Sequence, residues 1–148
     1  MKTTIKYTKQ LINMTMLVKQ YEMDRKECKV FRRTATCIKK DLKLDTEIIF
    51  VNSKDKKNFT SPNINGIYND LTKRIIIFID NKRSIDDIVY TIIHELTHAY
   101  QDKYMHDKYK KSLKELRSKK VSYKNSWHEK HANETAKRLS CNYNYIAA

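Results

Sequence analysis

The chain has 148 residues, of which 40% are hydrophobic and 10% aromatic, so residues 1–148 are enough for one domain with its own core. One glycine and one proline exclude the glycine-rich loops that bind phosphates. Three cysteines without a CxxC pair favour reduced thiols, as in a cytoplasmic protein. The longest apolar run, 75–79, is far shorter than the ~20 residues of a membrane span, so we expect no membrane partner.

The positive charge of the chain is unevenly distributed. Thirty-one basic against seventeen acidic residues give a net charge of +14. Segment 1–40 has eleven basic and three acidic residues, and segment 102–124 has nine and three. Clustered lysines and arginines are typical of proteins that bind phosphate backbones, so DNA is a candidate partner of both segments. A merely solvated basic surface is the alternative, because net charge bears on solubility more than on a specific site.

The first part of the chain is predicted to be helical. Apolar residues recur at steps of three and four over 7–21 and again over 28–42, with a gap at Arg25. This spacing predicts one long helix or two consecutive helices over 8–42.

A short sheet is predicted over 46–80. A β-branched run at 47–51 predicts its first strand, and a polar loop with the only proline and glycine follows. Two apolar runs separated by a turn predict a hairpin over 67–79. With helices on both sides in the sequence, the expected class is α+β, with a short antiparallel or mixed sheet.

Two helices are predicted after the sheet. Ser84 and Asp87 have the spacing of a capping box, which starts a helix over 85–105. Its aliphatic stripe lies opposite a polar face that carries two histidines and Gln101. Ser126 is a candidate cap for a last helix over 127–140. The basic stretch between these helices is weakly periodic and predicts a loop around a short helix.

The predicted helix over 85–105 carries an HExxH motif, in which the histidines are His94 and His98. Residues four apart lie on one helical face, so both imidazoles can bind one Zn²⁺. Glu95 is rotated by one residue, so it is placed to reach a zinc-bound water as a general base. We therefore expect one Zn²⁺ per chain, with a third protein ligand from elsewhere.

The best candidate for the third ligand is Glu129 in the last predicted helix. Asn133 lies one turn further on the same face and could orient a ligand imidazole through a hydrogen bond. Ala132 and Ala136 offer small contacts for close helix packing. The alternative ligands are His128, His131, Glu134 and Cys141.

A peptide-hydrolysing site also needs donors for the oxyanion that forms on the attacked carbonyl. The sequence does not choose among the residues near the candidate ligands. The candidates are His128, His131, Tyr123 and Tyr143.

These motifs resemble those of the zincin metallopeptidases, and of the gluzincins in particular. The sequence from His94 to Ala99 resembles the active-site helix of the thermolysin group. The stretch from Glu129 to Ala136 is similar to the ExxAN-x-x-A helix of the ImmA/IrrE family of small intracellular metallopeptidases. The resemblance implies a small zincin-like domain in which His94, His98 and Glu129 bind zinc and Glu95 is the base. It also implies that a peptide binds beside an edge strand between 67 and 79.

The sequence departs from the ImmA/IrrE pattern at His131 and Thr135, where that family usually has Glu and Phe. A second resemblance is to SprT-like proteases, which pair HExxH with a third histidine and act on DNA-associated proteins. His128 or His131 and the basic segment 102–124 would fit that family.

The leading hypothesis is therefore a cytoplasmic zinc endopeptidase that hydrolyses a protein or peptide substrate. By the ImmA/IrrE resemblance, one regulatory protein is a candidate substrate. The second hypothesis is an SprT-like protease. A hypothesis of another class is a basic nucleic-acid-binding protein with a structural zinc.

Overall fold

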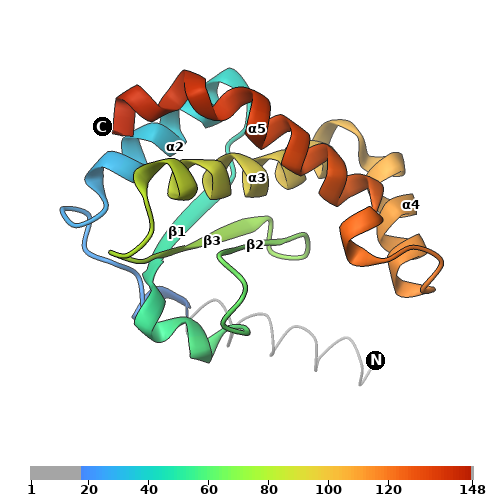
Figure 1. The fold of residues 1–148 in the computed structure, drawn as a ribbon, viewed down its shortest axis with the longest axis horizontal. Helices are drawn as coiled ribbons and strands as arrows, with labels where there is room; N and C mark the ends of the chain where they lie inside the picture. The colour runs from blue at the N-terminus through green and yellow to red at the C-terminus, as the bar shows by residue number, and fades with distance from the viewer. Residues whose placement is uncertain (1–17, 148) are drawn as a thin grey trace.

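Helices cover one face of a three-stranded sheet in the computed structural model, which describes residues 18–147 (Figure 1). The elements in chain order are α2 (Lys29–Asp41), β1 (Glu47–Asn52), the 3₁₀ helix η1 (Ser53–Asn58), β2 (Gly66–Asn69), β3 (Arg74–Ile79), α3 (Ile85–Tyr104), α4 (His106–Arg117), the 3₁₀ helix η2 (Tyr123–Asn125) and α5 (Trp127–Ala147). The α+β class is confirmed. No helix among the described residues is long and apolar enough to cross a membrane.

The sheet has the strand order β1-β3-β2. β2 and β3 form the predicted hairpin and pair antiparallel, with Tyr68 opposite Ile75. β1 pairs parallel to β3, with Phe50 opposite Ile77, so the sheet is mixed. β3 is central and four of its six residues are buried, which explains its continuous apolar sequence. β2 is therefore the edge strand that lies toward the helix carrying HExxH.

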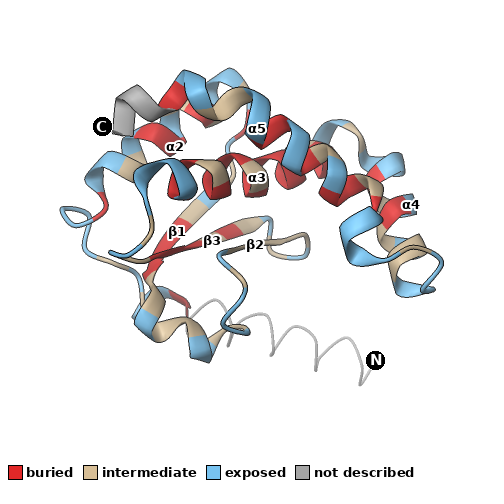
Figure 2. Cartoon of the chain, in the orientation of Figure 1, coloured by how far each residue is buried: buried red, intermediate tan, exposed pale blue. Residues whose placement is uncertain are grey.

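α3 is the middle layer of the molecule, between the sheet and α5 (Figure 1). It begins as predicted, because the Ser84 Oγ accepts a hydrogen bond from the Asp87 N–H at 3.1 Å. Its aliphatic residues, such as Val89 and Leu96, are fully buried in the main hydrophobic core. Its polar face is also largely buried, because α5 lies over it (Figure 2).

One continuous helix over 8–42 is not what the structure shows in its described part. Residues 18–20 are helical and α2 begins at Lys29, but residues 21–28 between them are not helical. In this segment the Met23 N–H donates to the Phe50 carbonyl at 2.8 Å, and Glu22 bridges to Val51. The gap in the apolar series at Arg25 coincides with this contact to β1. The part of the prediction over 8–17 lies outside the described residues.

The remaining elements refine the predictions. The predicted loop after β1 begins with η1, and the basic stretch after α3 contains a full helix, α4. α5 begins at Trp127 as predicted but continues to Ala147, beyond the predicted end at 140. The Ser126 carbonyl accepts the first helical bond, from the Lys130 N–H, while its hydroxyl donates to the Tyr123 carbonyl.

Candidate metal centre

Three side chains converge where α3 crosses the first turns of α5. His98 Nε2 lies 2.9 Å from Glu129 Oε1, and His94 Nε2 lies 3.2 Å from Glu129 Oε2. The two Nε2 atoms are 3.2 Å apart. Ligand atoms of a tetrahedral zinc, each bonded at about 2.0–2.1 Å, are about 3.3–3.4 Å from one another. His94, His98 and Glu129 are thus a cluster that could hold a metal ion.

Close packing of α3 against α5 brings these ligands together. Ala132 and Ala136 are fully buried on the face of α5 that carries Glu129. Small residues at these positions let the two helices approach closely. The side chains of His98 and Glu129 are less than one tenth exposed as a result. The predicted role of the two alanines in helix packing is therefore consistent with the structure.

The electrostatics of the cluster fit a cation. Within the described part of the chain, Glu95 and Glu129 are recorded in ion pairs only with histidines. Burial alone would raise the pKa of Glu129, but hydrogen bonds from His94 and His98 hold it well below its usual range. Burial also opposes protonation of His98, yet its bond to Glu129 leaves its pKa raised. Two buried carboxylates around two imidazoles are a donor set suited to a divalent metal.

Glu95 lies beside the cluster and against the edge strand. Its Oε1 is 4.0 Å from His94 Nε2, and its carboxylate accepts the backbone N–H of Tyr68 in β2. Burial raises the pKa of Glu95, and the interactions with His98 and His94 oppose this only in part. A buried carboxylate next to a group of side chains that could hold a metal ion, but outside that group, has the position that a general base requires.

The only glycine of the chain allows β2 to approach Glu95. A Cβ atom at Gly66 would lie 2.8 Å from Glu95 Cγ and 2.9 Å from Thr91 Cγ2. Both distances are shorter than real Cβ contacts. Gly66 is thus required for space, since its backbone angles do not need a glycine. From the sequence alone, Gly66 was predicted only to lie in a loop.

Gln101 connects the cluster to α5, and sequence analysis gave it no role. Its side chain is fully buried and its Oε1 lies 3.0 Å from His98 Nδ1. Its Nε2 lies 3.0 Å from the His128 carbonyl and 2.8 Å from His131 Nδ1. If Nε2 donates both of these bonds, Oε1 accepts from His98 Nδ1–H, which leaves the lone pair of His98 Nε2 facing the cluster. The sequence feature that could have indicated this role is the position of Gln101, one helical turn after His98 on the same face of α3.

His128 lies next to the cluster but is not one of the three grouped ligands. Its Nε2 is 4.0 Å from Glu129 Oε1. Its Nδ1 is 2.7 Å from Ser112 Oγ in α4, and its backbone N–H donates to the same Oγ. Burial and the neighbouring His98 lower the pKa of His128, which favours a neutral ring. His131 instead stacks on Trp127 and bonds to Gln101.

The two tyrosines predicted as oxyanion donors, Tyr123 and Tyr143, lie in different parts of the molecule. Tyr123 is 58% exposed, and its hydroxyl is hydrogen-bonded to Glu129; partial desolvation of the hydroxyl and this carboxylate raise its pKa. Tyr143 lies about 21 Å from Glu129 along α5, at a rise of 1.5 Å per residue, and its hydroxyl donates a hydrogen bond to Asp41. Its predicted role as an oxyanion donor is therefore wrong, because the helix carries it away from the cluster.

The structure gives Asn133 another partner than the predicted ligand imidazole. Its Oδ1 accepts from the Tyr90 hydroxyl at 3.1 Å, and the Tyr90 ring stacks on His94. Glu134 is exposed on another face of α5, and Cys141 is exposed about 18 Å along the helix from Glu129. Neither belongs to the cluster.

Two cavities meet at the cluster. One, of about 240 Å³, is lined by His94, Glu95 and Asn133 and by residues 63–66. The other, of about 340 Å³, is lined by Glu95, His98 and Glu129 and extends between β2 and α4. The cluster therefore lies between two depressions along the edge strand.

Comparison with models of known families, with curated proteins and with solved structures finds no match for this chain.

Proposed function

We propose that this protein is a zinc-dependent endopeptidase. The observation that carries the proposal is the convergence of His94, His98 and Glu129, with Glu95 beside them, in a cleft along an exposed strand edge. Each element of this arrangement matches the needs of peptide hydrolysis: a metal, a base and a strand for the peptide to pair with. The gluzincin resemblance of the motifs supports the same function.

His94, His98 and Glu129 would hold the zinc through two imidazole nitrogens and a carboxylate. When bound, zinc acidifies water and polarises a carbonyl oxygen. Glu95 takes the proton of the attacking water and delivers it to the leaving amine. Its contact with the Tyr68 N–H supports this role, because a peptide paired with β2 would lie close to Glu95.

His128 and Tyr123 are the donors placed to stabilise the oxyanion. The Ser112 hydroxyl accepts the His128 backbone N–H and lies 2.7 Å from His128 Nδ1, to which it can donate its own proton. This arrangement leaves a proton on Nε2, which faces the cluster near Glu129. The Tyr123 hydroxyl also lies at Glu129. Hydrogen-bond donors at this place strengthen as negative charge develops on the attacked carbonyl.

The first test is zinc content per chain, measured by elemental analysis on protein purified without a histidine tag. We expect about one zinc in the wild type, loss of zinc in Glu129→Ala, and retention in the neighbouring control His128→Gln. Glu95→Gln should keep zinc and lose peptide hydrolysis. A wild type that takes up no zinc, or unchanged hydrolysis by Glu95→Gln, would contradict the proposal.

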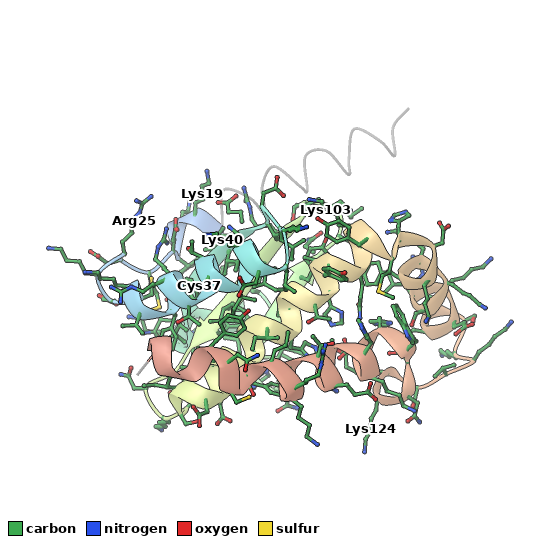
Figure 3. All side chains as sticks on the ribbon, turned by 90° about the horizontal axis from the view of Figure 1, so that it is seen from above. Lys19, Arg25, Cys37, Lys40, Lys103 and Lys124 are labelled. Atoms are coloured by element: carbon green, nitrogen blue, oxygen red, sulfur yellow. The ribbon has the colours of Figure 1, made fainter. Side chains whose placement is uncertain are left out.

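A second candidate function, nucleic-acid binding, is favoured by one surface. Lys29, Arg33 and Lys40 lie on one exposed stripe of α2, and Figure 3 shows Lys40 on the outer side of this helix. Such a stripe can follow a phosphate backbone. The test is the salt dependence of DNA binding for the wild type and for Lys29→Glu with Arg33→Glu. Tight binding that the double variant loses and that Glu95→Gln retains would favour this function.

A further inference from the structure

The larger of the two cavities at the cluster has apolar walls. On one side lie Ile64 and Ile67, from β2 and the loop before it. On the other side lie Tyr109, Leu113 and Leu116, all on one face of α4 because they are spaced by four and three residues. The charged groups that line this cavity belong to the candidate metal centre itself. An apolar depression thus opens directly beside the place of hydrolysis.

α4 is held against this centre by specific contacts. Ser112 bonds to His128, and the Tyr109 ring lies 5.9 Å from the His128 ring and 6.5 Å from the His98 ring. At the sheet end, Lys110 Nζ lies 2.9 Å from Asp70 Oδ2 in the hairpin turn. The cavity wall is therefore built on a helix with fixed position, rather than on a loop.

The size of the cavity limits its occupant. At about 340 Å³ it lies at the lower end of the ~300–1,000 Å³ range of small-molecule sites. A single large side chain fits this space, while a folded structure does not. Burial of an aromatic or leucine-sized side chain between apolar walls is favourable, whereas a charged side chain would lose its hydration there.

The outer side of α4 is strongly basic. Lys114 and Arg117 follow Leu113 and Leu116 directly, are exposed, and have no recorded ion pair within residues 18–147. Further lysines follow α4, and Figure 3 shows Lys124 pointing away from the molecule. These charges attract acidic residues in whatever chain passes over the wall.

From these observations we propose that the substrate is an extended protein segment with a large apolar side chain next to the scissile bond and acidic residues beyond it. The apolar side chain enters the cavity between β2 and α4, and the acidic residues meet Lys114 and Arg117 of α4. The proposal rests on the proposed peptidase function, and it names the substrate class of that site.

The test uses a mixture of random dodecamer peptides and the zinc-loaded full chain, with new peptide ends sequenced by mass spectrometry. We expect Phe, Tyr, Leu or Met at one position beside the cleaved bond, enriched more than fivefold over the mixture, and Asp or Glu enriched beyond it. Leu116→Trp fills the cavity and should shift this position to Ala, Ser or Gly. The matched control Lys111→Trp, on the opposite face of α4, should keep the wild-type preference.

Binding of the same peptides to zinc-loaded Glu95→Gln separates the two proposals. Cleavage without a preference beside the bond overturns the substrate class and leaves the peptidase intact. Binding of apolar, acidic peptides without cleavage by the wild type overturns the peptidase and keeps the recognition site. Neither cleavage nor selective binding overturns both. An unchanged preference in Leu116→Trp also overturns the assignment of this cavity.

Discussion

The two sides of the cleft are built in different ways. The pair α3 and α5 buries its polar groups in a connected set of hydrogen bonds that centres on Gln101. The wall formed by α4 and the hairpin is tied down at a few points, such as Ser112 with His128 and Lys110 with Asp70. In the proposed peptidase, the first region would fix the chemistry and the second would shape what can enter. Substitutions should therefore affect metal binding in one region and selectivity in the other.

The largest effect is expected for Gln101→Leu in the first region. The change leaves His98 Nδ1 and the His128 carbonyl without their partner. We expect the free energy of unfolding to fall by about 1–3 kcal/mol, measured by urea denaturation. Zinc affinity should fall about 10- to 100-fold, measured by competition with a chelator.

Gln101→Glu is the matched control, because it keeps an acceptor for His98 Nδ1–H. It should recover more of the zinc affinity than of the stability. If Gln101→Leu binds zinc as tightly as the wild type, the proposed role of Gln101 in orienting His98 is wrong.

Gly66→Ala should separate chemistry from metal binding at the boundary of the two regions. Its Cβ would meet Glu95 Cγ at 2.8 Å, so either β2 or Glu95 must move. We expect full zinc content but peptide hydrolysis reduced about 10- to 100-fold, because the base is displaced. Asn65→Ala, at the exposed neighbouring position, should be close to wild type. Zinc loss in Gly66→Ala would show that the strand supports the ligands as well.

Asp102 of α3, which bonds to the hairpin, should make the stability of the protein depend on pH. Burial would raise its pKa, but hydrogen bonds from Lys73 and Tyr68 lower it below its usual value. The ionised form is therefore stabilised by folding, and this contribution is lost as the pH falls below about 4. Wild type should be more stable than Asp102→Asn at pH 6, and the difference in urea midpoint should shrink toward pH 3. A constant difference would show that this carboxylate adds nothing through its charge.

The smallest effect is expected for Lys110→Ala in the second region. The ion pair with Asp70 is partly exposed, so its loss should cost less than about 1 kcal/mol. Zinc content should not change. A loss of zinc would mean that the wall formed by α4 and the hairpin is not independent of the candidate metal centre.

The pairing of His94 with His98 was predictable because its spacing is local, and Ala132 and Ala136 on the face of Glu129 indicated the helix that packs against them. His94 and His98 share a helix with a recognisable start, and Glu129 lies in the first turn of another. Helical periodicity alone determines which side chains of such segments share a face. The hairpin was predictable for the same reason, from its apolar runs and the turn between them.

The surroundings of the ligands were not predictable, because they arise from contacts between distant segments. Gln101 meets His128 across 27 residues, and Ser112 meets the same histidine across 16. Nothing in the local sequence distinguishes Asn133 as a partner of Tyr90 rather than of an imidazole. The break in the helix over 21–28 likewise involves contacts with β1, which helical periodicity does not predict.

The short length of β2 has a kinetic consequence. The strand has four residues, so a peptide paired along its outer edge gains about two to four backbone hydrogen bonds, each worth about 0.5–1.5 kcal/mol. One outward N–H, that of Tyr68, already contacts Glu95. If the proposed peptidase function is correct, cleaved fragments would therefore be held weakly and would dissociate quickly. Residence time on this protein would depend on the side chains of the substrate more than on its backbone.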